Sequence, residues 1–126
     1  MAEHNELGTW GEQLAARFLE EKGYTVVERD WRLGKRDIDI IALTPDGVTT
    51  VFVEVKTRSS DIVAKPEDAI DRNKVRSIGY AANAYVKEHV VLGELRFDTV
   101  TIVGRKDSKN LRVEHVEDAF NPLLFY

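Results

Sequence analysis

Acidic and basic side chains alternate with apolar ones in two short stretches. Their carboxylates are of the type that binds metal ions in proteins. The stretches are Arg36-Asp37-Ile38-Asp39-Ile40-Ile41 and Val51-Phe52-Val53-Glu54-Val55-Lys56. Both patterns are typical of β-strands, whose successive side chains point to opposite faces. Asp37 and Asp39 therefore share one face of the first strand, and Glu54 and Lys56 share one face of the second.

The turn between the two strands decides whether these charged faces meet. It contains a proline, preset for a turn, and a glycine that can adopt a positive φ. A four-residue loop over 45–48 predicts Asp39 opposite Glu54 and Asp37 opposite Lys56, with Cβ atoms about 4.5 to 5.5 Å apart. A slip of one residue would send the two sets to opposite faces.

Such a cluster is suited to hydrolysis of a phosphodiester, which needs a metal ion and a positioned water. Asp39 and Glu54 offer the hard oxygen ligands that Mg²⁺ or Mn²⁺ prefers, and the Val55 carbonyl offers another. Lys56 is placed to orient the attacking water or to stabilise the charged transition state. Asp37 would contact the metal ligands and not the metal itself.

The same spacing also has a plainer explanation. A Glu-x-Lys facing an Asp can be the solvated face of a two-stranded ribbon with cross-strand ion pairs. The site is favoured because Val, Ile and Phe surround the charges, as in a central strand, where charge is unusual. Glu12 is ambiguous in the same way, because it either caps a helix beginning at Thr9 or faces the acidic cluster.

Four basic residues near the strand pair are candidates for phosphate contact, with a solvated loop as the alternative. They are Arg32, Lys35, Arg36 and Arg58. The formal net charge of the 126-residue chain is -4, which argues against a protein that coats nucleic acid through bulk electrostatics. An enzyme needs only local positive charge around its acidic site.

Composition places the chain among single-domain globular proteins, here over residues 1–126. The chain is 43% hydrophobic and 32% charged, which is ordinary for that class. It has no cysteine, so disulfides and thiolate metal sites are excluded. No apolar run reaches the length of a membrane span, and the N-terminus lacks a signal-peptide pattern, so we expect a cytoplasmic protein without membrane contact.

The predicted elements alternate between helix and strand, which favours an α/β sandwich around a mixed sheet. They are a helix over Trp10–Lys22 capped by Thr9 and stopped by Gly23, strands over Tyr24–Trp31, 36–41 and 51–56, a loop over Ser59–Lys65, a helix from Pro66 to His89, and strands over Leu95–Val103 and Leu111–Val116. The apolar tail Phe120–Tyr126 is expected to pack on the body or on a partner chain.

Five stretches resemble, in order, motifs of the YraN-like family of small bacterial proteins. They are Gly11–Ala16, Arg29–Arg32, Asp37–Ala42, Phe52–Arg58 and Arg96–Asp98. This family, functionally uncharacterised as a whole, is similar to archaeal Holliday junction resolvases. The resemblance covers nearly the whole chain and implies a restriction-endonuclease-like sandwich, with a mixed central sheet of about five strands flanked by helices.

The resemblance also implies roles for individual residues. The acidic residue of the second core strand falls on Asp39, the Glu-x-Lys on Glu54 and Lys56, and the helix glutamate on Glu12. This chain departs from the family where Arg36-Asp37 replaces the usual Gly-Glu, which affects the mouth of the site but none of the three core positions.

The preferred hypothesis is therefore a Mg²⁺-dependent endonuclease acting on DNA that is branched or structured, as a homodimer if it cuts two symmetric strands. The alternative is a non-catalytic accessory module in DNA repair or recombination, which binds nucleic acid or a protein partner. A third reading is a structural domain with a fossil site. That reading predicts little change, or a gain in stability, when the carboxylates are removed.

Overall fold

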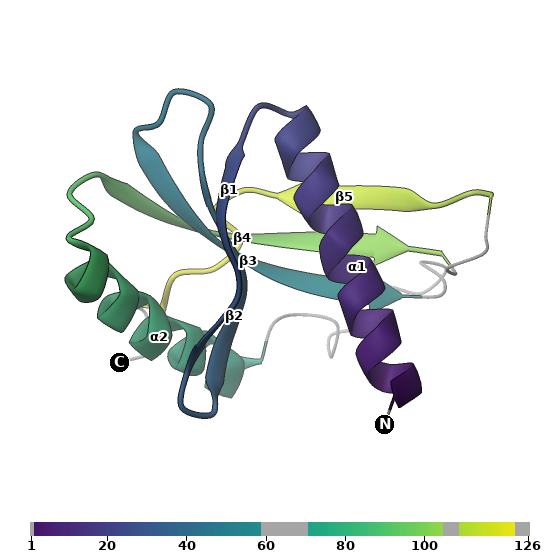
Figure 1. The fold of residues 1–126 in the computed structure, drawn as a ribbon, viewed down its shortest axis with the longest axis horizontal. Helices are drawn as coiled ribbons and strands as arrows, with labels where there is room; N and C mark the ends of the chain where they lie inside the picture. Colours follow the sequence, from purple (N-terminus) through teal and green to yellow (C-terminus); the bar gives the residue numbers. More distant parts are fainter. Residues whose placement is uncertain (1, 59–70, 105–108, 123–126) are drawn as a thin grey trace.

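A single mixed sheet organises the part of the chain that the computed structural model describes, residues 2–58, 71–104 and 109–122, with side chains described from Thr9. The elements are α1 Ala2–Glu21, β1 Thr25–Leu33, β2 Arg36–Leu43, β3 Thr49–Arg58, α2 Arg72–His89, β4 Glu94–Val103 and β5 Arg112–Val116. The strand order is β1-β2-β3-β4-β5 (Figure 1). Only β3 and β4 are parallel. The predicted α/β sandwich with a mixed five-stranded sheet is confirmed.

The two helices pack on opposite faces of this sheet, because apolar side chains along the central strands alternate in direction. On the α1 side, Leu19 packs with Ile40, Val53 and other buried residues. On the α2 side, Ile78 packs with Phe52 and other buried residues. No helix in the described part of the chain is both long and apolar enough to cross a membrane.

Helix α1 is longer than predicted. It begins at Ala2, so Thr9 lies inside the helix and the predicted N-cap at Thr9 is wrong. The polar composition before Thr9 concealed this first part of the helix. The predicted stop is confirmed, because Gly23 has a φ of +93° and its N–H donates to the Glu20 carbonyl at 3.0 Å.

Helix α2 begins at Arg72, with Asp71 as its N-cap. The Asp71 side chain accepts a hydrogen bond from the Asn73 N–H at 2.9 Å. The start proposed at Pro66 and the loop before it lie outside the described residues. Four residues at helical spacing, Val75, Ile78, Ala82 and Tyr85, are buried.

The register between β2 and β3 is the predicted one. Ile40 pairs with Val53, and the Thr44 N–H donates to the Thr49 carbonyl at 3.0 Å across the turn. This ladder ends at Ile40, whereas the β1–β2 pairing continues to Arg36. Figure 1 shows β2 bending away from β3 beyond this point. The functional candidates lie where the two strands separate.

The chain after β5 returns to the body, as the apolar tail predicted. Phe120 is buried, and its ring centroid lies 5.6 Å from that of Phe97. The Ala119 N–H donates to the Phe97 carbonyl at 2.8 Å. The last four residues of the tail lie outside the described part.

Candidate active site

Asp39 lies where β2 leaves β3, and it replaces the missing strand pairing. Its Oδ2 accepts a hydrogen bond from the Val55 N–H at 2.8 Å, and the residue is only 8% exposed. The N–H and C=O of one strand residue point to the same side of the strand. The Val55 carbonyl therefore faces the same gap as the Asp39 carboxylate, as a ligand to a shared cation must.

Glu54 completes a pair of buried carboxyl groups with Asp39. Its side chain is 12% exposed, and within the described residues its Oε2 is buried with no hydrogen-bond partner. Burial and the Asp39 charge raise the pKa of Glu54 to about 8. Burial also raises the pKa of Asp39, more than the Val55 N–H lowers it. The pair thus holds a proton near neutral pH unless a bound metal ion compensates its charge.

Glu12 approaches this pair from α1, on the other side of the sheet. Burial and the charge of Asp39 raise the pKa of Glu12 to about 7. Helix α1 packs closely on β3 because residue 11 is a glycine. A Cβ added at Gly11 would lie 2.6 Å from Cγ2 of Thr57 on β3. Because Thr9 lies inside the helix, the capping-box explanation of Glu12 is wrong.

Lys74, which the sequence analysis did not single out, reaches the site from α2. Its Nζ lies 3.5 Å from Oδ1 of Asp37 and 3.7 Å from Oε1 of Glu54. Burial opposes the Lys74 charge, but the surrounding carboxylates outweigh burial and raise its pKa. Asp37 therefore has its ion pair with Lys74, and the predicted pairing of Asp37 with Lys56 is not part of the strand ladder, which ends at Ile40.

The predicted basic residues separate into different parts of the molecule. Lys56 is half-buried on β3, two positions after Glu54. Lys35 and Arg36 lie at the β1–β2 turn, whereas Arg32 pairs with Asp30 at 3.1 Å. Arg58 ends β3 and accepts the Gly104 N–H through its carbonyl at 2.7 Å.

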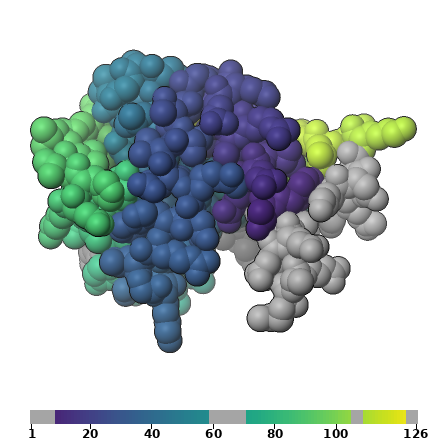
Figure 2. All heavy atoms as spheres, viewed as in Figure 1, coloured from purple at the N-terminus to yellow at the C-terminus, as the bar shows by residue number. Residues whose placement is uncertain are grey.

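A groove of about 580 Å³ lies between the β1–β2 turn and the start of α2. Lys35 and Arg36 line one side, and Arg76 and Tyr80 line the other. The Arg36 guanidinium lies 4.8 Å from the centroid of the half-exposed Tyr80 ring. Figure 2 shows the β1–β2 turn projecting from the lower edge of the molecule. The groove therefore presents cations and an aromatic ring, and two of its lining residues, Arg36 and Asn73, directly precede Asp37 and Lys74 in the chain.

The donor set fits Mg²⁺ better than a metal that needs many protein ligands. In the described ranges, no three His, Asp or Glu side chains converge closely enough to hold a metal ion. Mg²⁺ commonly uses one or two carboxylates and retains several waters. Asp39, Glu54 and the Val55 carbonyl match this pattern, and the unsatisfied Glu54 Oε2 is the atom that a cation would satisfy.

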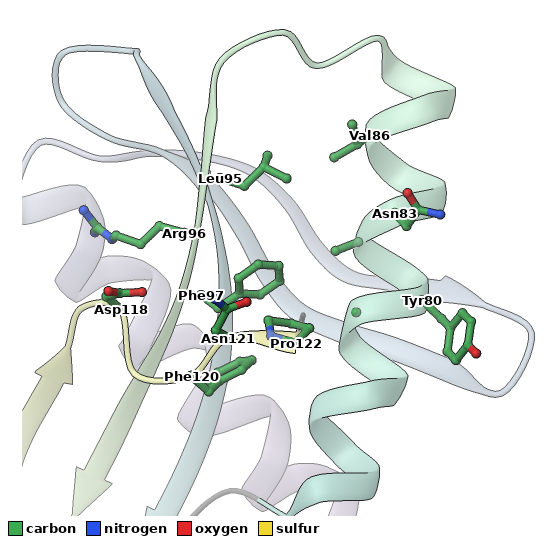
Figure 3. Close-up of a pocket in the computed structure, with 12 residues that line it drawn as sticks. Tyr80, Asn83, Val86, Leu95, Arg96, Phe97, Asp118, Phe120, Asn121 and Pro122 are labelled. Atoms are coloured by element: carbon green, nitrogen blue, oxygen red, sulfur yellow. The ribbon is translucent and has the colours of Figure 1, made fainter. Parts of the chain in front are cut away.

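A second cavity, of about 480 Å³, lies between α2, β4 and the segment after β5. Figure 3 shows Phe97, Phe120 and Pro122 gathered below Leu95, opposite the side chain of Val86 on α2. Its charged lining consists of Arg96 and Asp118. It lacks the paired carboxylates of the first site and offers no equivalent set of metal ligands among the described side chains.

Comparison with known proteins confirms the resemblance. The model of the "Uncharacterised protein family UPF0102", the YraN family, matches residues 11–102. A UPF0102 protein of Bacteroides thetaiotaomicron is 44% identical over 125 residues, covering 99% of this chain and 100% of the relative. A UPF0102 protein of Flavobacterium psychrophilum is 42% identical over 120 residues, covering 95% and 98% respectively. The matched region contains the whole acidic cluster.

Proposed function

Because the chain belongs to the uncharacterised family UPF0102, whose description names no activity, we propose a function from the chain's own geometry. The function is that of a Mg²⁺- or Mn²⁺-dependent endonuclease that hydrolyses phosphodiesters of DNA, with branched or structured DNA as the preferred class. The observation that carries this proposal is the buried Oε2 of Glu54 beside the Asp39 carboxyl group. This oxygen has no hydrogen-bond partner among the residues that the structure describes. An unsatisfied buried carboxylate is costly unless it serves a ligand.

Each residue of the site has a separate task under this proposal. Asp39 and Glu54 would hold the metal together with the Val55 carbonyl. Bound there, the metal would lower the pKa of a water and offset negative charge on the phosphate. Lys56, on the Glu54 face of β3, would orient the nucleophile. Glu12, with a pKa of about 7, is suited to exchange a proton near neutral pH.

The groove beside the site supports a nucleic acid as the substrate. Lys35 and Arg36 supply positive charge on one side of it, and Arg76 on the other. Tyr80 adds an exposed ring, on which an unpaired base can stack. Charge concentrated in one groove allows an acidic protein, with a net charge of -4, to bind a polyanion locally.

The test is a cleavage assay on end-labelled single-stranded, duplex, flap and four-way-junction DNA in Mg²⁺ or Mn²⁺. We expect cleavage that requires metal and falls at least about a hundredfold in Asp39→Asn and in Lys56→Ala. Glu20→Gln and Lys87→Ala each remove one charge of the same sign at exposed positions and should retain activity.

Two other outcomes would reject the catalytic proposal for this chain. Nucleic-acid binding that is indifferent to metal and to both site variants would favour the accessory-module alternative. Metal binding and cleavage both absent, with a stability gain in Asp39→Asn, would favour the fossil site.

A further inference from the structure

The position of Lys74 relative to the carboxylate pair leads to an inference about how the site is controlled. Its ammonium group lies 3.5 Å from Asp37 and 3.7 Å from Glu54, which places a positive charge at the mouth of the site. Its side chain is 34% exposed, so the ammonium group has solvent on one side. These separations are long for ion pairs with strong hydrogen bonds, which lie near 2.7 to 2.9 Å.

The backbone under Lys74 is fixed, although its side chain is long and flexible. The next residue, Val75, is 1% exposed and belongs to the core between α2 and the sheet. The Val75 N–H also donates to the Asp71 carbonyl at 2.9 Å, which closes the first turn of the helix. Movement of the Lys74 charge therefore requires only rotation of its side chain.

The location of Lys74 in α2 is unfavourable for the helix itself. A cation in the first helical turn opposes the macrodipole, and α2 has no acidic residue in that turn to compensate. Asp71 at the N-cap offsets the macrodipole, and the carboxylates of β2 and β3 are the groups next to the Lys74 charge itself. The acidic site thus supplies the electrostatic reason for a lysine at this position.

We propose that Lys74 is a tethered counterion of the carboxylate pair, which a divalent cation must displace from Glu54 before it can bind. Lys74 compensates the acidic cluster when no metal is present, and it weakens metal binding by direct charge competition. It thereby makes occupation of the site dependent on the concentration of the divalent ion. A polyanion that draws the ammonium group away would promote metal binding. This inference rests on the proposed metal site.

The experiment is calorimetric titration of Mg²⁺ into the metal-free full chain at low ionic strength and pH 8.5. We expect Lys74→Met to bind Mg²⁺ about tenfold more tightly than the wild type, because a like charge within a few ångströms has been removed. Lys74→Arg retains the charge and should bind as the wild type does. Lys87→Met, in the exposed last turn of the same helix, controls for the change in net charge.

A second readout does not depend on calorimetric heats. Saturating Mg²⁺ should raise the melting temperature of Lys74→Met more than that of the wild type, because tighter binding stabilises the folded state more. Circular dichroism of the metal-free variants checks that each is folded.

The outcomes separate this inference from the proposed function. If the wild type binds Mg²⁺, Asp39→Asn does not, and Lys74→Met binds no more tightly than Lys87→Met, the counterion role is overturned and the metal site stands. If neither the wild type nor Lys74→Met binds Mg²⁺, the metal site and the counterion role both fail. Binding in Lys74→Met alone supports both.

Discussion

Two buried carboxylates on neighbouring strands, Glu54 of β3 and Asp98 of β4, have opposite surroundings. Asp98 is fully buried and accepts hydrogen bonds from Nε2 of His115 at 2.7 Å, from Arg96 through two nitrogens at 2.9 Å, and from the Asp118 N–H at 3.0 Å. Glu54 has an ion pair with Lys74 at 3.7 Å and a buried Oε2 without a partner in the described part of the chain.

The pKa values of the two groups reflect this difference. Burial alone would raise the pKa of Asp98, but hydrogen bonds from His115 and Arg96 outweigh burial and lower it. Burial and the Asp39 charge raise that of Glu54 to about 8. A carboxylate that stabilises the fold is surrounded by donors, whereas one kept for a ligand lacks them. Asp98 is therefore structural and ties β4 to β5 and the following segment.

The largest expected effect is loss of stability in Asp98→Asn. This change keeps the size of the side chain but leaves Arg96 and His115 without their buried anionic partner. Breaking a buried ion pair in this way costs about 3 to 5 kcal/mol. Urea unfolding at pH 7 measures the loss. Asp30→Asn removes an exposed carboxylate paired with Arg32 and should cost less than about 1 kcal/mol.

The pH dependence gives an independent check on Asp98. Because its folded-state pKa is lowered, its contribution to stability is present above the ordinary value of 3.8 and is lost as pH falls through the folded-state value. The difference between wild type and Asp98→Asn should therefore shrink in acid. A loss below about 1 kcal/mol at pH 7 would contradict the structural role.

Glu54→Gln should have the opposite sign and a somewhat smaller size. Between its ordinary pKa of 4.5 and its folded-state pKa of about 8, the folded chain holds a proton that the unfolded chain has lost, so this group makes stability fall as pH rises. A glutamine cannot ionise, so the variant lacks this pH dependence. We expect the variant to be more stable at pH 9 by on the order of 3 kcal/mol, with no gain near pH 4.

Unfolding of both proteins at pH 4, 7 and 9 measures this difference. Glu20→Gln, at an exposed position of α1, controls for the loss of one negative charge. A variant less stable than the wild type at pH 9 would show that Glu54, like Asp98, stabilises the fold. The contrast between the two carboxylates would then disappear.

The sequence predicted the strand pair well because its information is local. Alternation of apolar and charged residues set the faces, and the proline and glycine of the turn set the register, which brought Asp39 beside Glu54. The family motifs added Glu12, which spacing alone assigned to a cap. The polar start of α1 misled that assignment, since a long helix with few apolar residues leaves no periodic signal.

Lys74 was missed because no local spacing connects it with Glu54, twenty residues earlier in the chain. A signal was nevertheless present, since α2 opens with Arg72, Lys74 and Arg76 where acidic residues are preferred. Such an opening indicates an acidic neighbour or an anionic ligand. Two donors to Asp98 were likewise invisible, because His115 and Asp118 reach it only when β4 and β5 pair, whereas Arg96 lies two residues away on the same strand.

A smaller effect is the energetic coupling between Glu12 and Asp39, which tests whether Glu12 belongs to the acidic cluster of Asp39 and Glu54. The charge of Asp39 raises the pKa of Glu12, so removing either charge should relieve the repulsion between them. A double-mutant cycle with Glu12→Gln and Asp39→Asn, measured by urea unfolding at pH 9, should give a coupling of about 1 kcal/mol. Additive effects within about 0.3 kcal/mol would place Glu12 outside the cluster.

The smallest expected effect concerns the outer end of the Asp98 network. Nζ of Lys22 lies 2.7 Å from Nδ1 of His115, and because an ammonium group can only donate, Nδ1 is the acceptor. In this arrangement the Nε2 proton is directed at Asp98. Lys22→Met removes an exposed donor and should cost less than about 1 kcal/mol, because the Asp98 contact still fixes this tautomer. Nitrogen NMR of the His115 ring should show one protonated nitrogen, Nε2, in both proteins. A protonated Nδ1 in the wild type would contradict this arrangement of donors around Asp98. The contrast between Asp98 and Glu54 would then be weaker.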